Sequence, residues 1–163
     1  MTLHINPSTW IHPDFLELHS YLGPAFNLNW CNASDAKGKE DANSGRYKDN
    51  MNFIQNTMVF AYQNIGLLTQ HIHNPYIAKL LECTSDMQAS VLDYGAGGGQ
   101  VGLALHALGY QVSFADLYSQ SLMFLLWRLR ERKLDLPVFT ITEGCIIPHH
   151  DMVVCFDVIE HCN

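Results

Sequence analysis

The chain has 163 residues, of which 48% are hydrophobic and 15% are charged, and its formal net charge is −7. This length and composition are typical of one globular domain that buries a full core. The acidic balance argues against non-selective binding of nucleic-acid phosphates, which requires clustered Lys and Arg, so nucleic acid is not an expected partner.

The cysteines and the N-terminus indicate a cytoplasmic protein. The five cysteines are scattered without a C-x-x-C spacing, which fits a reducing compartment better than a disulfide framework. Cys145 and Cys155 lie in apolar runs, so we expect both to pack as small buried hydrophobes. The N-terminus lacks a basic start with an apolar signal core, and no apolar run approaches a membrane-spanning length. We therefore expect no membrane partner.

Residues 1–84 are predicted to form an N-terminal segment of helices and loops. One short helix is predicted over residues 14–21, because Pro13 suits the first turn and Gly23 marks the end. Residues 32–50 contain almost no large apolar side chains, which predicts a loop.

Two more helices are predicted before the chain changes character. Apolar residues recur at helical spacing over residues 53–70, which predicts an amphipathic helix. Asn74 is a suitable N-cap and Pro75 a suitable first residue for the next helix. The predicted buried side of that helix consists of Tyr76, Ile77, Leu80 and Leu81.

Residues 85–163 alternate short apolar runs with helical patterns, which predicts an α/β core. Strands are predicted over residues 91–93, 112–115, 138–142 and 152–156. Continuous apolar strands of this length are typical of a parallel sheet packed between helices. Because crossovers between parallel strands are right-handed, we expect a Rossmann-like, doubly wound parallel sheet. The strand order that we expect is 3-2-1-4.

Two crossover helices are predicted in this core, over residues 100–108 and 119–133, with Ser119 as the N-cap of the second. The predicted buried residues are Val101, Leu105 and Leu108 in the first helix and Leu122, Leu125, Leu126 and Leu129 in the second. The second helix also carries a basic cluster. Its members, Arg128, Arg130, Arg132 and Lys133, are expected to form a solvated face.

Residues 91–102, VLDYGAGGGQVG, combine a strand end, an acidic residue, a glycine-rich turn and a helix start. This arrangement forms a site for a nucleotide-shaped ligand at the carboxyl end of a parallel strand. The spacing is D-x-G-x-G-x-G, and the dinucleotide motif G-x-G-x-x-G can also be placed from Gly97 to Gly102, so spacing alone leaves the ligand open. The carboxylate of Asp93 favours S-adenosylmethionine, because it would repel a pyrophosphate and suits a sulfonium and an ammonium group.

Two more acidic residues follow later strands. Asp116 ends the second predicted strand, where its carboxylate can accept both ribose hydroxyls of an adenosine while Leu117 covers one face of the adenine. Asp116 alone could equally cap a turn, but its pairing with the glycine-rich turn favours the ligand. Glu143 follows the third strand and could accept the exocyclic amine of adenine, with the amide of Gly144 near the ring; a surface acid in a loop is the alternative.

Four motifs in chain order, VLDYGAGGG, VSFADL, ITEG and DMVVCFDVIEH, resemble the class I S-adenosylmethionine-dependent methyltransferases, in the branch whose fourth strand ends in D-V-[IL]-E-H. The resemblance covers residues 91–161. It implies methyl transfer by in-line displacement at the sulfonium carbon, with S-adenosylmethionine as the cofactor. The cofactor-binding residues that it implies are Asp93, Tyr94, Gly95, Ala96, Gly97, Gly99, Asp116, Leu117, Glu143, Gly144, Phe156 and Asp157.

Several parts of the site stay unassigned at this stage. Neither the methyl acceptor nor a catalytic base follows from the sequence. Asp157, Glu160 and His161 would share one side of a helix, which could hold a divalent metal. The resemblance favours a role for these three residues in structuring the loop, so no metal is expected. Arg46 and Tyr47 could fold over the donor as part of an N-terminal lid.

The sheet of this family normally has seven strands, whereas only the first four can be placed here, so strands five to seven are missing. The strand over residues 152–156 would then be an unprotected apolar edge, open to self-association or to a partner chain. We expect a fragment of a longer reading frame; half of a split enzyme, or a shortened non-catalytic domain that binds the donor as a scaffold, are the alternatives. A NAD-type dinucleotide-binding oxidoreductase domain is the other candidate function.

Overall fold

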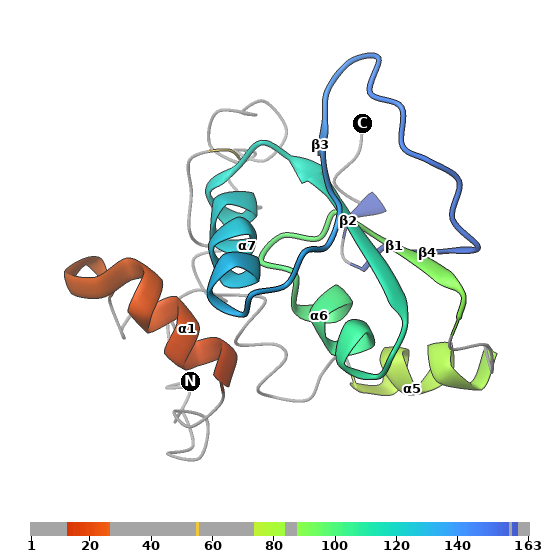
Figure 1. Ribbon diagram of the computed structural model, residues 1–163, viewed down its shortest axis with the longest axis horizontal. Helices are drawn as coiled ribbons and strands as arrows, with labels where there is room; N and C mark the ends of the chain where they lie inside the picture. The colour runs from red at the N-terminus through yellow and green to blue at the C-terminus, as the bar shows by residue number, and fades with distance from the viewer. Residues whose placement is uncertain (1–12, 27–54, 56–73, 84–87, 157, 160–163) are drawn as a thin grey trace, which may run out of the picture.

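The computed structural model describes residues 13–26, 55, 74–83, 88–156 and 158–159. Its centre is a four-stranded parallel sheet in the order β3-β2-β1-β4 (Figure 1). The strands are β1 (Ser90–Tyr94), β2 (Gln111–Leu117), β3 (Val138–Ile141) and β4 (Met152–Val154). The strand order and the Rossmann-like class predicted from the sequence are confirmed.

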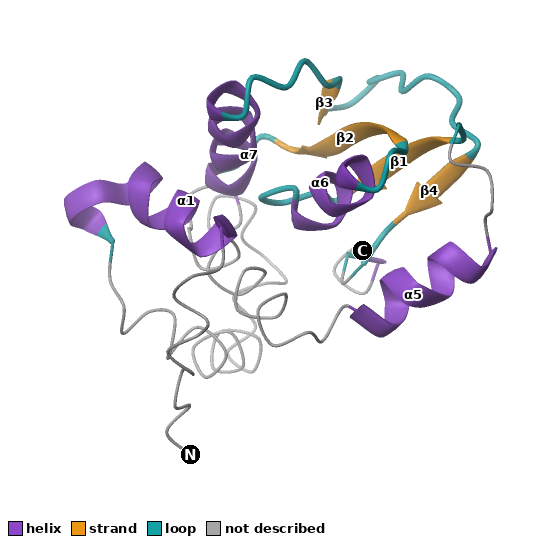
Figure 2. Cartoon of the chain, turned by 60° about the horizontal axis from the view of Figure 1, so that its bottom comes forward, coloured by secondary structure: helices purple, strands orange, loops and turns teal. Residues whose placement is uncertain are grey.

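The two predicted crossover helices are present as α6 (Gln100–Ala107) and α7 (Gln120–Glu131). Ser119 caps α7 as predicted, because its hydroxyl accepts a hydrogen bond from the Leu122 amide at 3.1 Å. The right-handed crossovers β1–α6–β2 and β2–α7–β3 run in the same direction across the sheet, which places both helices on one face. Figure 2 shows α6 against β1 and β2.

The N-terminal part contributes α1 (Pro13–Leu22), the short 3-10 helix η2 (Gly23–Ala25) and α5 (Asn74–Cys83). The helix expected over residues 14–21 is therefore confirmed, and α5 begins at Asn74 itself. The predicted loop over 32–50 lies outside the described residues, as does all of the predicted helix over 53–70 except residue 55. In the part of the chain that the structure describes, no helix is long and apolar enough to cross a membrane.

The core has two parts that meet on α7. The main cluster lies between the sheet and the two crossover helices and includes Val91, Leu105, Val112, Phe114, Leu122, Leu125 and Leu129. A smaller cluster of Phe15, Leu18 and Phe124 joins α1 to α7. In Figures 1 and 2 α1 lies beside α7, away from the sheet. Two sides of α7 are thus covered by protein.

Two predictions for α7 were wrong, and the docking of α1 explains both. Arg128, expected on a solvated face, is completely buried because it points to the side of α7 that α1 covers, where Phe124 also lies. Leu126, expected in the core, is 41% exposed. It shares the remaining side of the helix with Met123 and Arg130, three and four residues away, and both are exposed as well.

Three other predicted buried residues are exposed. Leu108 is 44% exposed because it caps the C-terminal end of α6, beyond the turns that pack on the sheet. Leu81 is 37% exposed, while its neighbour Leu80 packs against the main cluster. Cys145 is exposed because its apolar run belongs to the irregular connection between β3 and β4.

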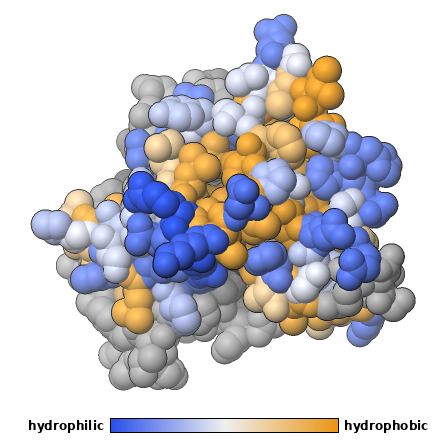
Figure 3. Space-filling view, viewed as in Figure 1, coloured by the Kyte–Doolittle hydropathy of each residue, from blue (hydrophilic) through white to orange (hydrophobic). Residues whose placement is uncertain are grey.

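The edge of the sheet at β4 carries exposed apolar side chains. Among the described strands, β4 pairs only with β1, and Val153 at its centre is 59% exposed. Ile146, in the connection that leads to β4, is 88% exposed. Figure 3 shows hydrophobic surface at the upper right of the molecule, where this connection runs. The observed strand ends at Val154, two residues before the predicted end.

Candidate functional site

The glycine-rich turn between β1 and α6 has a backbone that only glycine adopts readily. Gly95, Gly97 and Gly99 have φ values of 74°, 53° and 76°, in the left-handed region where a side chain is strained. Space is also lacking at two of these positions. A Cβ at Gly95 would lie 2.2 Å from a methyl carbon of Val158, and one at Gly99 would lie 2.4 Å from a methyl carbon of Leu125.

The amides of the turn are largely occupied by acceptors of the protein itself. The Gly95 and Ala96 amides both donate to the carbonyl of Ala115 on β2, at 2.8 and 3.2 Å. The Gly99 amide donates to the carbonyl of Ala96 at 2.7 Å. The turn is therefore tied to the end of β2 and closed on itself, which fixes its shape before any ligand arrives.

Asp116, at the end of β2, reaches across to the turn. Its Oδ2 accepts a hydrogen bond from the Gly97 amide at 2.5 Å, and its Oδ1 accepts one from the Leu117 amide at 2.6 Å. Burial raises the pKa of this carboxyl, against these two hydrogen bonds. Each carboxylate oxygen has a second lone pair, so Asp116 can still accept two hydroxyl groups of a ligand.

Asp93, near the end of β1, caps the first turn of α6. It is 5% exposed, and its Oδ2 accepts a hydrogen bond from the Gly102 amide at 2.8 Å. Burial raises the pKa of Asp93 to about 7; the Gly102 hydrogen bond opposes this shift and the charge of Asp116 adds to it. A Cβ at Gly102 would lie 2.3 Å from Phe114 and 2.9 Å from Asp93, so glycine here allows α6 to approach the sheet closely.

The structure brings most of the predicted site residues to one edge of the sheet. Asp93, Tyr94, Gly95, Ala96, Gly97, Gly99, Asp116 and Leu117 all lie at the carboxyl ends of β1 and β2. Tyr94, Gly95, Asp116 and Leu117 are half-buried, so a ligand can reach this edge. Of the remaining predicted residues, three follow the neighbouring strands β3 and β4, and Asp157 lies outside the described part.

Glu143 and Gly144 follow β3, the strand next to β2, and both are exposed. Phe156 lies beyond β4 and packs against the main core cluster. Asp157 lies outside the described residues, together with Glu160 and His161. Within the ranges that are described, no group of three or more His, Cys, Asp or Glu could hold a metal ion.

Three residues next to the turn were not predicted from the sequence as site residues. Val158 packs on Gly95, and Arg128 donates through Nη1 to the Gly98 carbonyl at 2.5 Å. Gln100 is 4% exposed, and its Nε2 has no hydrogen-bond partner among the described residues. Val158 belongs to the D-V-I-E-H segment, which was a usable signal, but the position of Arg128 has no local signature.

No protein-family model matches the chain, and no curated protein matches it. Among solved structures, the magnesium protoporphyrin IX methyltransferase of Synechocystis PCC 6803 with bound SAM is similar, with a TM-score of 0.50 and 20% identity over 78% of this chain and 64% of that one. The same enzyme with bound SAH gives 0.48 and 21% identity, over 61% of this chain and 47% of that one. TehB from Haemophilus influenzae gives 0.43 and 25%, over 50% of this chain and 28% of that one.

The first of these similarities supports the fold. At 20% identity it is a likeness in the arrangement of strands and helices. The chain spans less than two thirds of the length of each of these structures. What the chain binds and which reaction it takes part in therefore have to be argued from the site itself.

Proposed function

We propose that this chain binds S-adenosylmethionine at the glycine-rich turn and forms the donor-binding part of a methyltransferase. The observation that carries this proposal is that two carboxylates, Asp93 and Asp116, accept hydrogen bonds from backbone amides at the turn and at the start of α6. Asp93 accepts from the first turn of α6 and Asp116 accepts from the Gly97 amide. Each carboxylate thus accepts from a backbone amide that a phosphate could otherwise use, one in the first turn of α6 and one in the glycine-rich turn.

This arrangement disfavours the alternative, a dinucleotide with a pyrophosphate. A pyrophosphate needs backbone amides that point at it, whereas the amides of Gly95, Ala96 and Gly99 donate to carbonyls of the chain. It would also lie close to the Asp93 and Asp116 carboxyls and be repelled when they are ionised. S-adenosylmethionine carries sulfonium and ammonium groups and a ribose diol. It therefore needs no free backbone amides for a phosphate, and the two carboxylates attract its cationic groups.

The residues fit S-adenosylmethionine in the following way. Asp116 would accept the ribose hydroxyls with the lone pairs that the Gly97 and Leu117 amides leave free. Asp93 would attract the ammonium and sulfonium charges, and Leu117 would lie against the adenine. Glu143 and Gly144, after β3, are the candidates for contact with the edge of the adenine. Phe156 would flank the donor near the acceptor side, and Asp157, for which the same role is proposed, lies outside the described residues.

Bound S-adenosylmethionine supplies an activated methyl group for in-line displacement by a nucleophile. The contribution of the protein is to hold the donor rigidly and to exclude water, since positioning accounts for a large share of the rate in such transfers. We further propose that the exposed edge at β4 binds another chain or chain segment, which would complete the acceptor side. A donor-binding scaffold without activity is the alternative role for the same site.

The Asp116 contact can be tested with a variant and a modified ligand. We expect Asp116→Asn to weaken binding of S-adenosylhomocysteine about 10- to 150-fold in isothermal titration calorimetry, because a charge-assisted hydrogen bond contributes about 1.5–3 kcal/mol. For a 2′,3′-dideoxy analogue of the same ligand, the wild type and the variant should bind with nearly equal affinity, because the hydroxyl groups are gone.

Asp135→Asn is the matched control for loss of one acidic charge, because Asp135 is exposed and lies outside the site. It should leave both affinities unchanged. An equal loss for S-adenosylhomocysteine and the dideoxy analogue would mean that Asp116 acts only by holding the turn, and tighter binding of NAD than of S-adenosylhomocysteine by the wild type would reject the proposed donor.

A further inference from the structure

Arg128 joins three separate parts of the molecule with one buried side chain. From α7, its Nη1 donates to the Gly98 carbonyl at 2.5 Å and its Nε donates to Oε2 of Glu17 on α1 at 2.7 Å. Its Nη2 pairs with Asp14, one turn earlier on α1. The guanidinium is planar and holds its donors in a fixed fork, so these contacts constrain one another.

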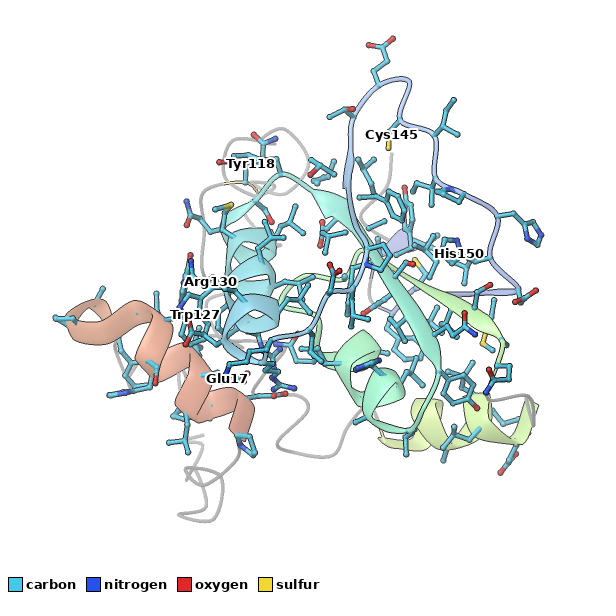
Figure 4. All side chains as sticks on the ribbon, in the orientation of Figure 1. Glu17, Tyr118, Trp127, Arg130, Cys145 and His150 are labelled. Carbon is cyan, nitrogen blue, oxygen red and sulfur yellow. The ribbon has the colours of Figure 1, made fainter. Side chains whose placement is uncertain are left out.

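Arg132 completes the anchor on α1. It donates through Nε to Oε1 of Glu17 at 2.6 Å and through Nη2 to Asp14 at 2.8 Å. Two guanidinium groups therefore face two carboxylates at the α1–α7 contact, so their formal charges balance. Figure 4 shows Glu17 between α1 and the C-terminal end of α7. Burial opposes ionisation of Glu17, yet the hydrogen bonds and charges of Arg132 and Arg128 hold its pKa below the ordinary value.

On the other side, Arg128 acts on a peptide unit at the centre of the glycine-rich turn. The Gly98 carbonyl and the Gly99 amide belong to the same peptide plane. Arg128 holds the carbonyl end, and the Ala96 carbonyl accepts from the amide end at 2.7 Å. Because both ends of this plane are fixed, rotation of the peptide is prevented, and the left-handed conformation at Gly99 is kept.

Two other side chains, Gln100 and Phe124, lie close to Gly98. A Cβ at Gly98 would lie 3.0 Å from Nε2 of Gln100 and 3.2 Å from the Phe124 ring. Nε2 of Gln100, although close to Gly98, makes no hydrogen bond with any described residue. Among the described side chains, Arg128 donates the hydrogen bond that the Gly98 carbonyl accepts.

We propose that Arg128 is a positioning residue for donor binding, and that Asp14 and Glu17 of α1 hold it in place, so that the N-terminal helix and the donor-binding turn are coupled. This inference rests on the proposed function for its effect on donor affinity. It assigns a role to α1, which lies at the side of α7 away from the sheet.

The test compares Arg128→Lys and Arg130→Lys in the full chain. Lysine keeps the positive charge but lacks the fork, so it cannot hold Gly98, Asp14 and Glu17 together. We expect Arg128→Lys to weaken S-adenosylhomocysteine binding about 10-fold or more in calorimetry. Arg130→Lys should leave the affinity unchanged, because the Arg130 side chain is exposed and its ion pair with Glu131 lies at the surface.

A second readout separates positioning from general stability. The amide resonance of Gly99 reports the peptide that Arg128 holds, and we expect it to move in Arg128→Lys, to move less in Glu17→Gln, and to stay in place in Arg130→Lys. If Arg128→Lys does not fold, Glu17→Gln decides, because it leaves Arg128 and its partner Asp14 intact.

Two results would overturn the inference. One is a lower unfolding temperature of Arg128→Lys with an unchanged dissociation constant, which would make Arg128 a purely structural residue. The other is a Gly99 resonance that responds neither to Arg128→Lys nor to Glu17→Gln. If the wild-type chain fails to bind S-adenosylhomocysteine, the proposed function fails, and the coupling of α1 to the turn is then judged by the Gly99 resonance alone.

Discussion

Replacing Gly99 with alanine is expected to destabilise the fold by about 2–5 kcal/mol, whereas the same change at Gly144 costs about 1–2 kcal/mol. The two glycines have nearly the same backbone, with φ of 76° and 77°, so the strain of a left-handed alanine is common to both. They differ in surroundings. A Cβ at Gly99 would lie 2.4 Å from Leu125, and one at Gly144 would have no atom of the described residues within 4 Å.

Urea unfolding gives the free energy of unfolding of each variant. The difference between Gly99→Ala and Gly144→Ala then separates the cost of the packing clash from the cost of backbone strain. Leu125 is fully buried and cannot move aside freely, so the difference between the variants measures the contact between the turn and α7. A Gly99→Ala, Leu125→Ala double variant should be less destabilised than the sum of the single changes, because the second change removes the clash. Equal costs for Gly99→Ala and Gly144→Ala would contradict the tight packing of the turn on α7.

Replacing Asp93 with asparagine is expected to stabilise the ligand-free protein above pH 7 and to weaken donor binding. The pKa of Asp93 is raised from 3.8 to about 7 in the folded chain. Between these values the unfolded chain has released the proton and the folded chain still binds it. The contribution of Asp93 to stability is thus complete below about pH 4, falls by about 1.4 kcal/mol per pH unit, and is lost above about pH 7.

Chemical unfolding between about pH 4 and pH 8 tests this sign. The stability of Asp93→Asn relative to the wild type should rise across this range, because asparagine does not ionise and its carbonyl can still accept from the Gly102 amide. Asp151→Asn is a control of opposite sign, since hydrogen bonds from the Ser90 amide and hydroxyl lower the pKa of Asp151. Its stabilising contribution is lost as the pH falls. A flat difference for Asp93→Asn would contradict the raised pKa.

The same carboxyl links the pH to the donor. A ligand that carries an ammonium group favours ionised Asp93 and lowers its pKa, so the affinity of the wild type for S-adenosylhomocysteine should increase from about pH 6 to about pH 8. Asp93→Asn should bind more weakly and lose this dependence. Ionised Asp93 would then destabilise the ligand-free protein, and the ammonium group of the bound ligand would offset this effect by pairing with the carboxylate.

The part of the molecule that local patterns determine could be predicted from the sequence. Short apolar runs indicated the four strands, and the predicted strand order 3-2-1-4 is the observed one. The glycines of the turn were identified because positive φ and close packing at Gly95 and Gly99 leave no other residue. Asp93 and Asp116 were placed correctly near the ends of β1 and β2, because the end of a strand is visible in the local sequence.

The buried contact between α1 and α7 could not be predicted from local patterns. A basic residue in a helix is usually solvated, and Arg128 is buried only because Asp14 and Glu17, which lie more than a hundred residues earlier in the chain, neutralise it. The exposure of Leu126 has the same origin, since α1 covers another side of α7. Helical periodicity indicates which residues share a side, and tertiary packing decides which side is covered.

The most direct test of the proposed donor site is an amide chemical-shift map of the full chain during titration with S-adenosylhomocysteine and, separately, with NAD. If the turn binds the donor, the largest shifts with S-adenosylhomocysteine will occur at residues 93–99 and 116–117, with smaller ones at 143–144, and NAD will cause none at equal concentration. Shifts with NAD at the turn, or shifts with S-adenosylhomocysteine that avoid Gly97 and Asp116, would contradict the proposed donor site.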